Sequence, residues 1–300
     1  MAGSTKTWVS FAPMVGFRFE GGTINLEPDV EIGPITEQEL GHAKRWPGGK
    51  EHATHAVRVI READRVTLEN RATIYTDSEA YSTIRNVLSG IRLFKRGAFG
   101  AALVMGYELS GGSASMSYGD EAPPVFPSGY QLTVAEADEL RAFWAERRAT
   151  FSGPPLEYAL SSFSLGCSRG YTEQALVDLT IAAEALFLGD VNDELKYRVA
   201  LRAAFFVADN PAERERVYDS VRDAYDVRSW IVHGKSRKVP TSLTRDASKQ
   251  PNVALALMAS GFQDTMRLAL RKATKLVATG AWPPGWERLI LGVDDADAQA

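Results

Sequence analysis

Residues 210–234 read NPAERERVYDSVRDAYDVRSWIVHG, and this stretch has the marks of one long helix. Asn210 is a favoured N-cap residue, and Pro211 suits the first helical position. Apolar residues recur at helical spacing along one side: Val217, Val221, Ala224, Tyr225 and Val227. Gly234 is a favoured C-terminal cap. The stretch therefore predicts a helix that ends at His233.

Helical patterns continue on both sides of this stretch. The other predicted helices are residues 156–167, 172–188, 192–208 and 252–279, with Asn192 as the N-cap of the third. A loop of roughly 17 residues follows Gly234, and long loops in compact domains are often functional. We expect residues 151–290 to form an all-α bundle and residues 291–300 an acidic, disordered tail.

Residues 1–150 alternate between strand and helix patterns. Strands are predicted at residues 8–11, 23–26, 53–60 and 98–109, and a helix at residues 78–95. Two capping boxes, each a Thr with a Glu three positions later, predict helices that begin at Thr36 and Thr133, the second reaching Arg148. We expect this half to be an α+β domain with mostly antiparallel pairing. The breaker run at residues 152–155 predicts the domain boundary there.

The composition of the chain limits the classes of function that the protein can have. Hydrophobic residues make up 45% of the chain and charged residues 24%, which is typical of globular proteins. The net charge of −4 means that a nucleic acid would need a local basic patch. The single cysteine, Cys167, excludes an intrachain disulfide and a Cys-based zinc site. No secretory signal and no apolar run of membrane-spanning length occur, so we expect a cytoplasmic protein without membrane contact.

Arg228 and His233 are the best candidates for catalysis. RNA can be cut by its own 2′-hydroxyl, with a base and an acid to move protons and a cation to stabilise the phosphorane. His moves protons near neutral pH, and the Arg fork binds phosphate oxygens, so this chemistry needs no cofactor or metal. On a helix the two residues lie about 140° apart. The alternative is structural, because Arg and His also suit the negative end of a helix.

His233 is the only histidine after residue 150. A mechanism with an acid and a base therefore needs a second copy of the chain, which a two-fold dimer would supply, or a different second group. Lys235, Arg237 and Lys238 follow directly and are candidates for holding the RNA backbone.

Three stretches resemble the HEPN superfamily, and within it the ApeA-like branch: residues 178–188, 198–206 and 225–234. The R-x4-6-H motif of the family maps onto Arg228 and His233. Ser229 stands at a position that is often polar, although many members have Asn there. Glu184 matches the acidic position of the stretch A-x-E-A-L-F-L.

The resemblance implies a bundle of four or more helices that dimerises, with both motifs in a shared cleft. It also implies metal-independent endoribonuclease activity, often in antiphage defence or toxin-type growth arrest. The N-terminal half is similar to the divergent domain that precedes such modules, and we expect it to bind a regulatory partner or ligand. The alternative is a non-catalytic HEPN module that binds nucleic acid or nucleotide, or scaffolds a complex.

Two supporting residues remain open from the sequence. A carboxylate at Glu184, within an apolar helix, is costly to bury alone. It would either orient Arg228 or His233, or pair with Arg198. Tyr225 lies one turn before Arg228, where it would pack or touch RNA. A metal site at His52 and His55 is disfavoured, since residues three apart on a strand point to opposite faces.

Overall fold

The computed structural model describes residues 6–43, 52–63, 65–67, 73–75, 78–101, 103–109, 114–118, 129–151, 153–189, 193–234 and 251–293. Its contacts divide the chain into two compact units, Met1–Arg148 and Ala149–Ala300. The first holds an antiparallel sheet with helices, and the second is mostly helical. The coarse prediction, an α+β half followed by a helical half, is confirmed.

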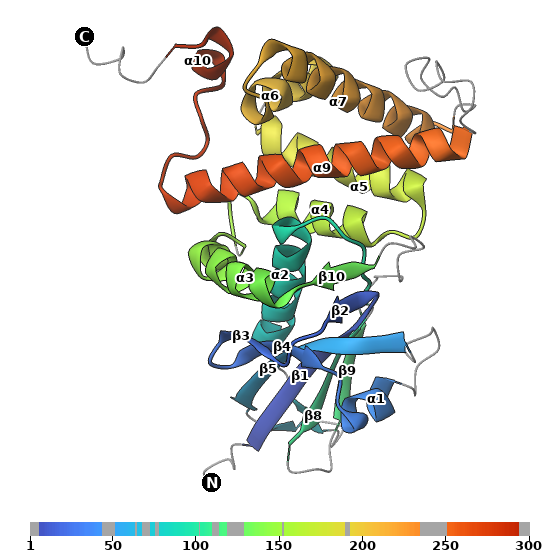
Figure 1. Ribbon diagram of the computed structural model, residues 1–300, viewed down its shortest axis with the longest axis vertical. Coiled ribbons are helices and arrows are strands. Elements are labelled where there is room, and N and C mark those ends of the chain that lie inside the picture. Colours follow the sequence, from blue (N-terminus) through green and yellow to red (C-terminus); the bar gives the residue numbers. More distant parts are fainter. Residues whose placement is uncertain are drawn as a thin grey trace. The chain divides into compact units, whose positions relative to one another are not determined.

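The N-terminal unit is built on an antiparallel sheet with strand order β3-β4-β5-β1-β8-β9 (Figure 1). The strands are β1 (Lys6–Val15), β3 (Ile24–Glu27), β4 (Val30–Pro34), β5 (Ala53–Ala63), β8 (Leu103–Glu108) and β9 (Ala114–Tyr118). Two separate pairs are β2 (Phe17–Phe19) with β10 (Tyr130–Leu132), which is parallel, and β6 (Arg65–Thr67) with β7 (Thr73–Tyr75), which is antiparallel.

Strand β1 is longer than predicted, and β8 is shorter. All side chains of β1 between Trp8 and Met14 are buried, so both faces of the strand are covered and polar alternation is lost. Val15 exchanges two backbone hydrogen bonds of 2.9 Å with Gly100, so Pro13 turns its nitrogen to the same side. Proline cannot donate, and the ladder between β1 and β8 stops at Phe11. The predicted strand at residues 98–109 is therefore interrupted.

The helices of this unit are α1 (Glu37–Ala43), α2 (Ser78–Phe94) and α3 (Val134–Arg147). Both predicted capping boxes are confirmed. The Thr36 backbone nitrogen donates to Glu39 at 2.8 Å, and the Glu39 nitrogen donates to the Thr36 hydroxyl at 3.2 Å. Thr133 caps α3 in the same reciprocal way. Helices α1 and α2 both contact β1, and α3 packs against β3 and α2.

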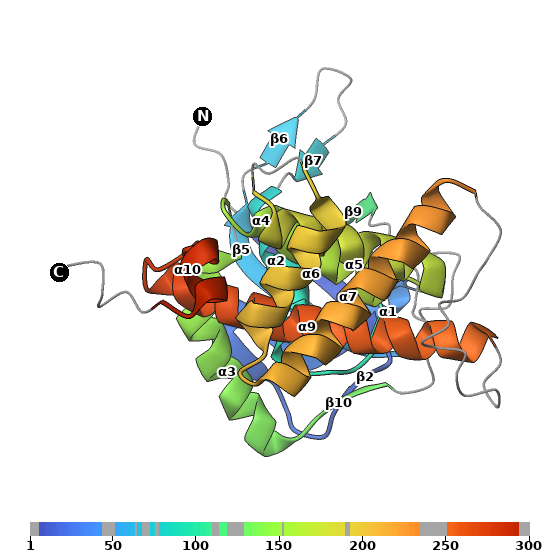
Figure 2. The same ribbon diagram turned by 90° about the horizontal axis from the view of Figure 1, so that it is seen from above.

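The C-terminal unit consists of α4 (Glu157–Ser168), α5 (Thr172–Phe187), α6 (Leu195–Val207), α7 (Pro211–Val232), α9 (Pro251–Ala278) and α10 (Trp286–Leu291). Consecutive pairs α4–α5 and α6–α7 pack together, and α9 runs across α4, α5, α6 and α7 (Figures 1 and 2). Residues on the inner face of α5, from Ala175 to Phe187, form the centre of this core. The bundle thus joins α7 to α5 and α9.

Two details differ from the predictions. Helix α6 begins at Leu195, directly after Glu194, which adopts the left-handed conformation (φ 54°) and makes no side-chain cap. Asn192, the predicted cap, lies outside the described residues. Helix α10 extends to Leu291, one residue into the predicted tail, and residues 294–300 lie outside the described part of the chain.

Aromatic side chains attach α10 to the bundle. Trp282 and Trp286 both meet the Phe206 ring edge-on, with centroids 5.8 and 5.7 Å away. Arg202 lies over the Trp286 ring at 5.2 Å and donates from Nη1 to the carbonyl of Phe187 at 2.5 Å. These contacts tie the segment after α9 to the ends of α5 and α6.

Candidate functional site

Helix α7 carries the predicted catalytic pair. Its start is fixed by Asn210, whose side chain accepts from the Glu213 nitrogen at 3.0 Å, and Pro211 occupies the first turn. Its end is fixed at His233, whose backbone nitrogen donates to the Ser229 carbonyl at 3.1 Å. Gly234 then adopts a left-handed conformation (φ 61°), which favours glycine. The predicted helix, N-cap and C-terminal glycine are confirmed.

Arg228 and His233 differ in their surroundings. His233 is exposed at the end of α7, whereas Arg228 is half-buried. Five residues of helix separate them by about 140° around the axis, so their side chains leave α7 in different directions. Within the described residues no contact joins the two side chains. Ser229, the polar residue after Arg228, is half-buried, and its carbonyl accepts the bond from His233.

The described residues leave part of the hydrogen-bonding capacity of Arg228 unused. Its Nε is buried, and the described residues offer it no acceptor. The guanidinium carbon lies 5.9 Å from the centroid of the Tyr225 ring, within the range of a cation–π contact. A buried donor without an acceptor is costly, because it has lost water and gained nothing. An anion that brought an acceptor to Arg228 would remove that cost.

Tyr225 links α7 to α5. Its hydroxyl hydrogen-bonds to the carboxylate of Glu184, and both side chains are half-buried. Burial, together with this bond and the negative charge of Glu184, raises the pKa of Tyr225 to about 12, although the charge of Arg228 acts against the rise. Tyr225 is therefore a protonated donor at neutral pH, and Glu184 accepts.

The sequence left two roles open for Glu184: it could orient Arg228 or His233, or it could pair with Arg198. Arg198 meets Glu194, the residue directly before its own helix, at 3.8 Å, and its buried Nε has no acceptor among the described residues. Glu184 meets Tyr225 instead. The structure thus brings Glu184, Tyr225 and Arg228 together and leaves His233 apart. Lys235, Arg237 and Lys238 lie outside the described residues.

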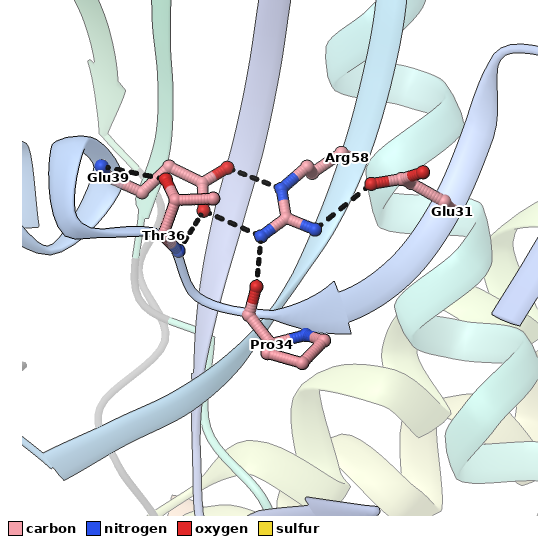
Figure 3. A network of polar contacts seen from close by, with 5 residues as sticks. All are labelled: Glu31, Pro34, Thr36, Glu39 and Arg58. Carbon is pink, nitrogen blue, oxygen red and sulfur yellow. Dashed lines mark hydrogen bonds and ion pairs between the residues drawn. The ribbon is translucent and has the colours of Figure 1, made fainter. Parts of the chain in front are cut away.

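A second charged cluster, which was not predicted from the sequence, lies in the N-terminal unit (Figure 3). Arg58 on β5 donates from Nε and Nη2 to the two carboxylate oxygens of Glu39, at 2.5 and 2.7 Å. Its Nη1 donates to Glu31 at 3.0 Å, and Nη2 also reaches the carbonyl of Pro34. Burial lowers the pKa of Arg58, but the bonds to Glu39 and Glu31 outweigh it and raise the pKa overall.

This network ties α1 and β4 to β5. Glu39 is fully buried and serves both Arg58 and the capping box of α1. Every nitrogen of the Arg58 guanidinium donates to an acceptor within the unit, and four of its five N–H groups are used in this way. A lone Arg within the predicted strand at residues 53–60 was the only signal in the sequence.

The described residues contain no group of three or more His, Cys, Asp or Glu side chains arranged to hold a metal ion. His55 is buried, with Nε2 3.1 Å from the Phe19 carbonyl and Nδ1 3.0 Å from the Thr54 hydroxyl. Burial, helped by the charge of Arg58, lowers the pKa of His55. None of the helices in the described part of the chain combines the length and apolarity needed to span a bilayer.

Comparisons with known proteins add no assignment. No protein-family model, curated protein or solved structure matches the chain.

Proposed function

We propose that the protein is a metal-independent endoribonuclease of the HEPN type, with Arg228 and His233 as its catalytic residues. One observation carries the proposal: Arg228 has a buried Nε without an acceptor among the described residues, on the same helix as the exposed imidazole of His233. A phosphate would satisfy the Arg228 donor, and an exposed imidazole can exchange protons with a bound substrate.

The reaction would proceed by transfer of the phosphorus between two oxygens of the RNA. The 2′-oxygen forms a bond to phosphorus as its proton passes to a base, and the bond to the 5′-oxygen breaks as that oxygen receives a proton from an acid. The products are a 2′,3′-cyclic phosphate and a 5′-hydroxyl. Arg228 would stabilise the negative charge of the phosphorane, and His233 would act in proton transfer.

A homodimer completes the proposed site. His233 is the only histidine after residue 150, and Arg228 and His233 diverge around one helix, so one copy offers a single histidine. In a two-fold dimer the α7 helices of two copies would face one cleft, with a second histidine on its other side. The exposure of His233 is compatible with this arrangement.

The biological setting belongs to the same proposal. The HEPN-type resemblance points to a prokaryotic antiphage or toxin-type effector that works in the cytoplasm. An unregulated ribonuclease harms its own cell, so the N-terminal unit is the natural place for a regulatory partner or ligand to act.

RNA cleavage by the purified protein in EDTA tests the proposal. The wild type should cut RNA and leave 2′,3′-cyclic phosphate and 5′-hydroxyl ends, while His233→Ala should lose about 100-fold or more of the rate. His55→Gln serves as the matched control, because it removes another histidine from a different unit. Equal cleavage by wild type and His233→Ala would remove His233 from the chemistry.

The divergence of Arg228 and His233 favours a second candidate, a non-catalytic module that binds nucleic acid or nucleotide through Arg228 or scaffolds a complex. Under this reading, the parent protein binds RNA but leaves it intact, and Arg228→Ala abolishes the binding.

A further inference from the structure

The Arg228 side chain is positioned by an aromatic ring on its own helix. Within the described residues Arg228 makes no ion pair, and its one aromatic contact is the Tyr225 ring, three residues earlier on α7. An arginine side chain that is held loosely must lose up to about 2 kcal/mol of conformational entropy when it binds a ligand. A rigid ring beneath the guanidinium would reduce that loss.

The Tyr225 ring is itself held from another helix. Its hydroxyl donates to the Glu184 carboxylate on α5, and α5 packs directly against α7. An ionised carboxylate only accepts hydrogen bonds, so Tyr225 must be the donor. The chain of contacts therefore runs from Glu184 through the tyrosine hydroxyl and ring to the guanidinium of Arg228.

We infer that Tyr225 is a positioning residue. Glu184 on α5 holds the Tyr225 hydroxyl, and the Tyr225 ring in turn holds the guanidinium of Arg228. The inference rests on the proposed function and deepens it. Glu184 and Tyr225 need not touch RNA in this role. Their contribution is to hold Arg228 where a phosphorane would form, since displacement of a catalytic group by about 1 Å can cost about 100-fold in rate.

Helix α7 contains a second arginine that lies over a tyrosine ring, but this arginine is also held by an ion pair. Arg222 lies over the Tyr218 ring at 5.7 Å, and it also forms an ion pair with Asp219 at 3.1 Å. The Tyr218 ring meets Tyr197 on α6 edge-on, at 6.4 Å between centroids. Arg222 thus has an ion pair that Arg228 lacks in the described part of the chain, which makes Tyr218→Phe a suitable control.

The first experiment measures cleavage of a defined RNA by the full-length protein. Tyr225→Phe and Glu184→Ala should each lower kcat about tenfold or more, with a smaller change in KM. The double variant should lose no more than either single variant, because both changes break one connection. Tyr218→Phe should match the wild type. Additive losses in the double variant, or an unchanged kcat in Tyr225→Phe, would overturn the inference.

The second experiment reads the position of Arg228 without RNA. Phenylglyoxal modifies exposed arginines, and peptide mass spectrometry follows the rate at Arg228 and at Arg222 separately. Tyr225→Phe and Glu184→Ala should speed modification of Arg228 severalfold and leave Arg222 unchanged. Circular dichroism on each variant confirms that the helices remain.

The two experiments separate the failure of one idea from that of the other. Faster modification of Arg228 in the variants, with no cleavage of RNA by the wild type, would overturn the proposed function and support the positioning role. Unchanged modification of Arg228, with cleavage by the wild type, would do the reverse.

Discussion

Arg58 and Arg228 show two ways in which a folded chain surrounds an arginine. All three nitrogens of Arg58 donate to acceptors within the N-terminal unit, two of them to the fully buried Glu39. Arg228 meets an aromatic ring and keeps a buried Nε without an acceptor among the described residues. The contacts of Arg58 hold the N-terminal unit together, whereas the Nε of Arg228 could still bond to an acceptor that a ligand brings.

The largest expected effect is on stability, at Arg58. Arg58→Ala leaves the Glu39 carboxylate buried without its cation, so the N-terminal unit should lose about 3–5 kcal/mol of unfolding free energy. Arg228→Ala should cost the C-terminal unit less than about 1 kcal/mol. Hydrogen exchange of peptides from β5 and α7 reports the two units separately. Similar losses from both substitutions would remove the contrast between the two arginines.

The second prediction concerns RNA binding, which should depend on Arg228 and not on Arg58. In a His233→Ala background, which prevents cleavage, Arg228→Ala should weaken RNA binding by about 1.5–3 kcal/mol, the value of a hydrogen bond to a charged group. The slope of log affinity against log salt should fall by about 0.7, as for one lost phosphate contact on single-stranded RNA. The matched substitution is Lys196→Ala, which removes a cation already paired with Asp226. An equal change in the salt slope for Lys196→Ala would mean that Arg228 has no special role.

The third prediction concerns the helix that carries Arg228. Asn210→Ala removes the acceptor for the Glu213 nitrogen and should destabilise the C-terminal unit by about 1 kcal/mol. Asn210→Gly should cost only a few tenths of a kcal/mol. Urea unfolding followed by exchange in α7 peptides provides the measurement, and equal losses from Ala and Gly would show that the cap bond contributes little.

The smallest expected effect is a pH dependence at His55. Its folded pKa lies below the ordinary value of about 6.5, so the folded state binds fewer protons than the unfolded state. The neutral ring therefore contributes stability above about pH 6.5, and this stability is lost as the pH falls through the folded pKa. His55→Gln should flatten the dependence in the N-terminal unit, while His233→Ala should leave the dependence of that unit unchanged. Unfolding free energies at a series of pH values decide between these outcomes.

Local signals in the sequence predicted much of the fold. The Thr36 and Thr133 capping boxes, the Asn210 cap and the Gly234 terminus each involve residues within one turn of one another, so short stretches reveal them. Strand lengths were less predictable. The extent of β1 depends on coverage of both its faces, and the interruption before β8 depends on Pro13 in a different strand.

Part of the candidate site could likewise be predicted from the sequence, and part could not. Arg228, His233 and Ser229 follow from one motif on one helix. The bond between Glu184 and Tyr225 joins α5 to α7, and the sequence offered Arg198 as an equally reasonable partner for Glu184. The Arg58 network escaped prediction altogether, because Glu39 and Arg58 lie on separate elements and the capping box already accounted for Glu39.

The double use of Glu39 couples the local unfolding of α1 to that of the sheet. One carboxylate completes the first turn of α1 and also balances Arg58 in the sheet. Helix ends usually fray independently of the core, but the first turn of α1 cannot unwind without exposing the buried ion pair. Helix α1 and the middle of β5 should therefore behave as one cooperative unit of local unfolding. A short helix thus opens no more readily than the strand to which it is tied.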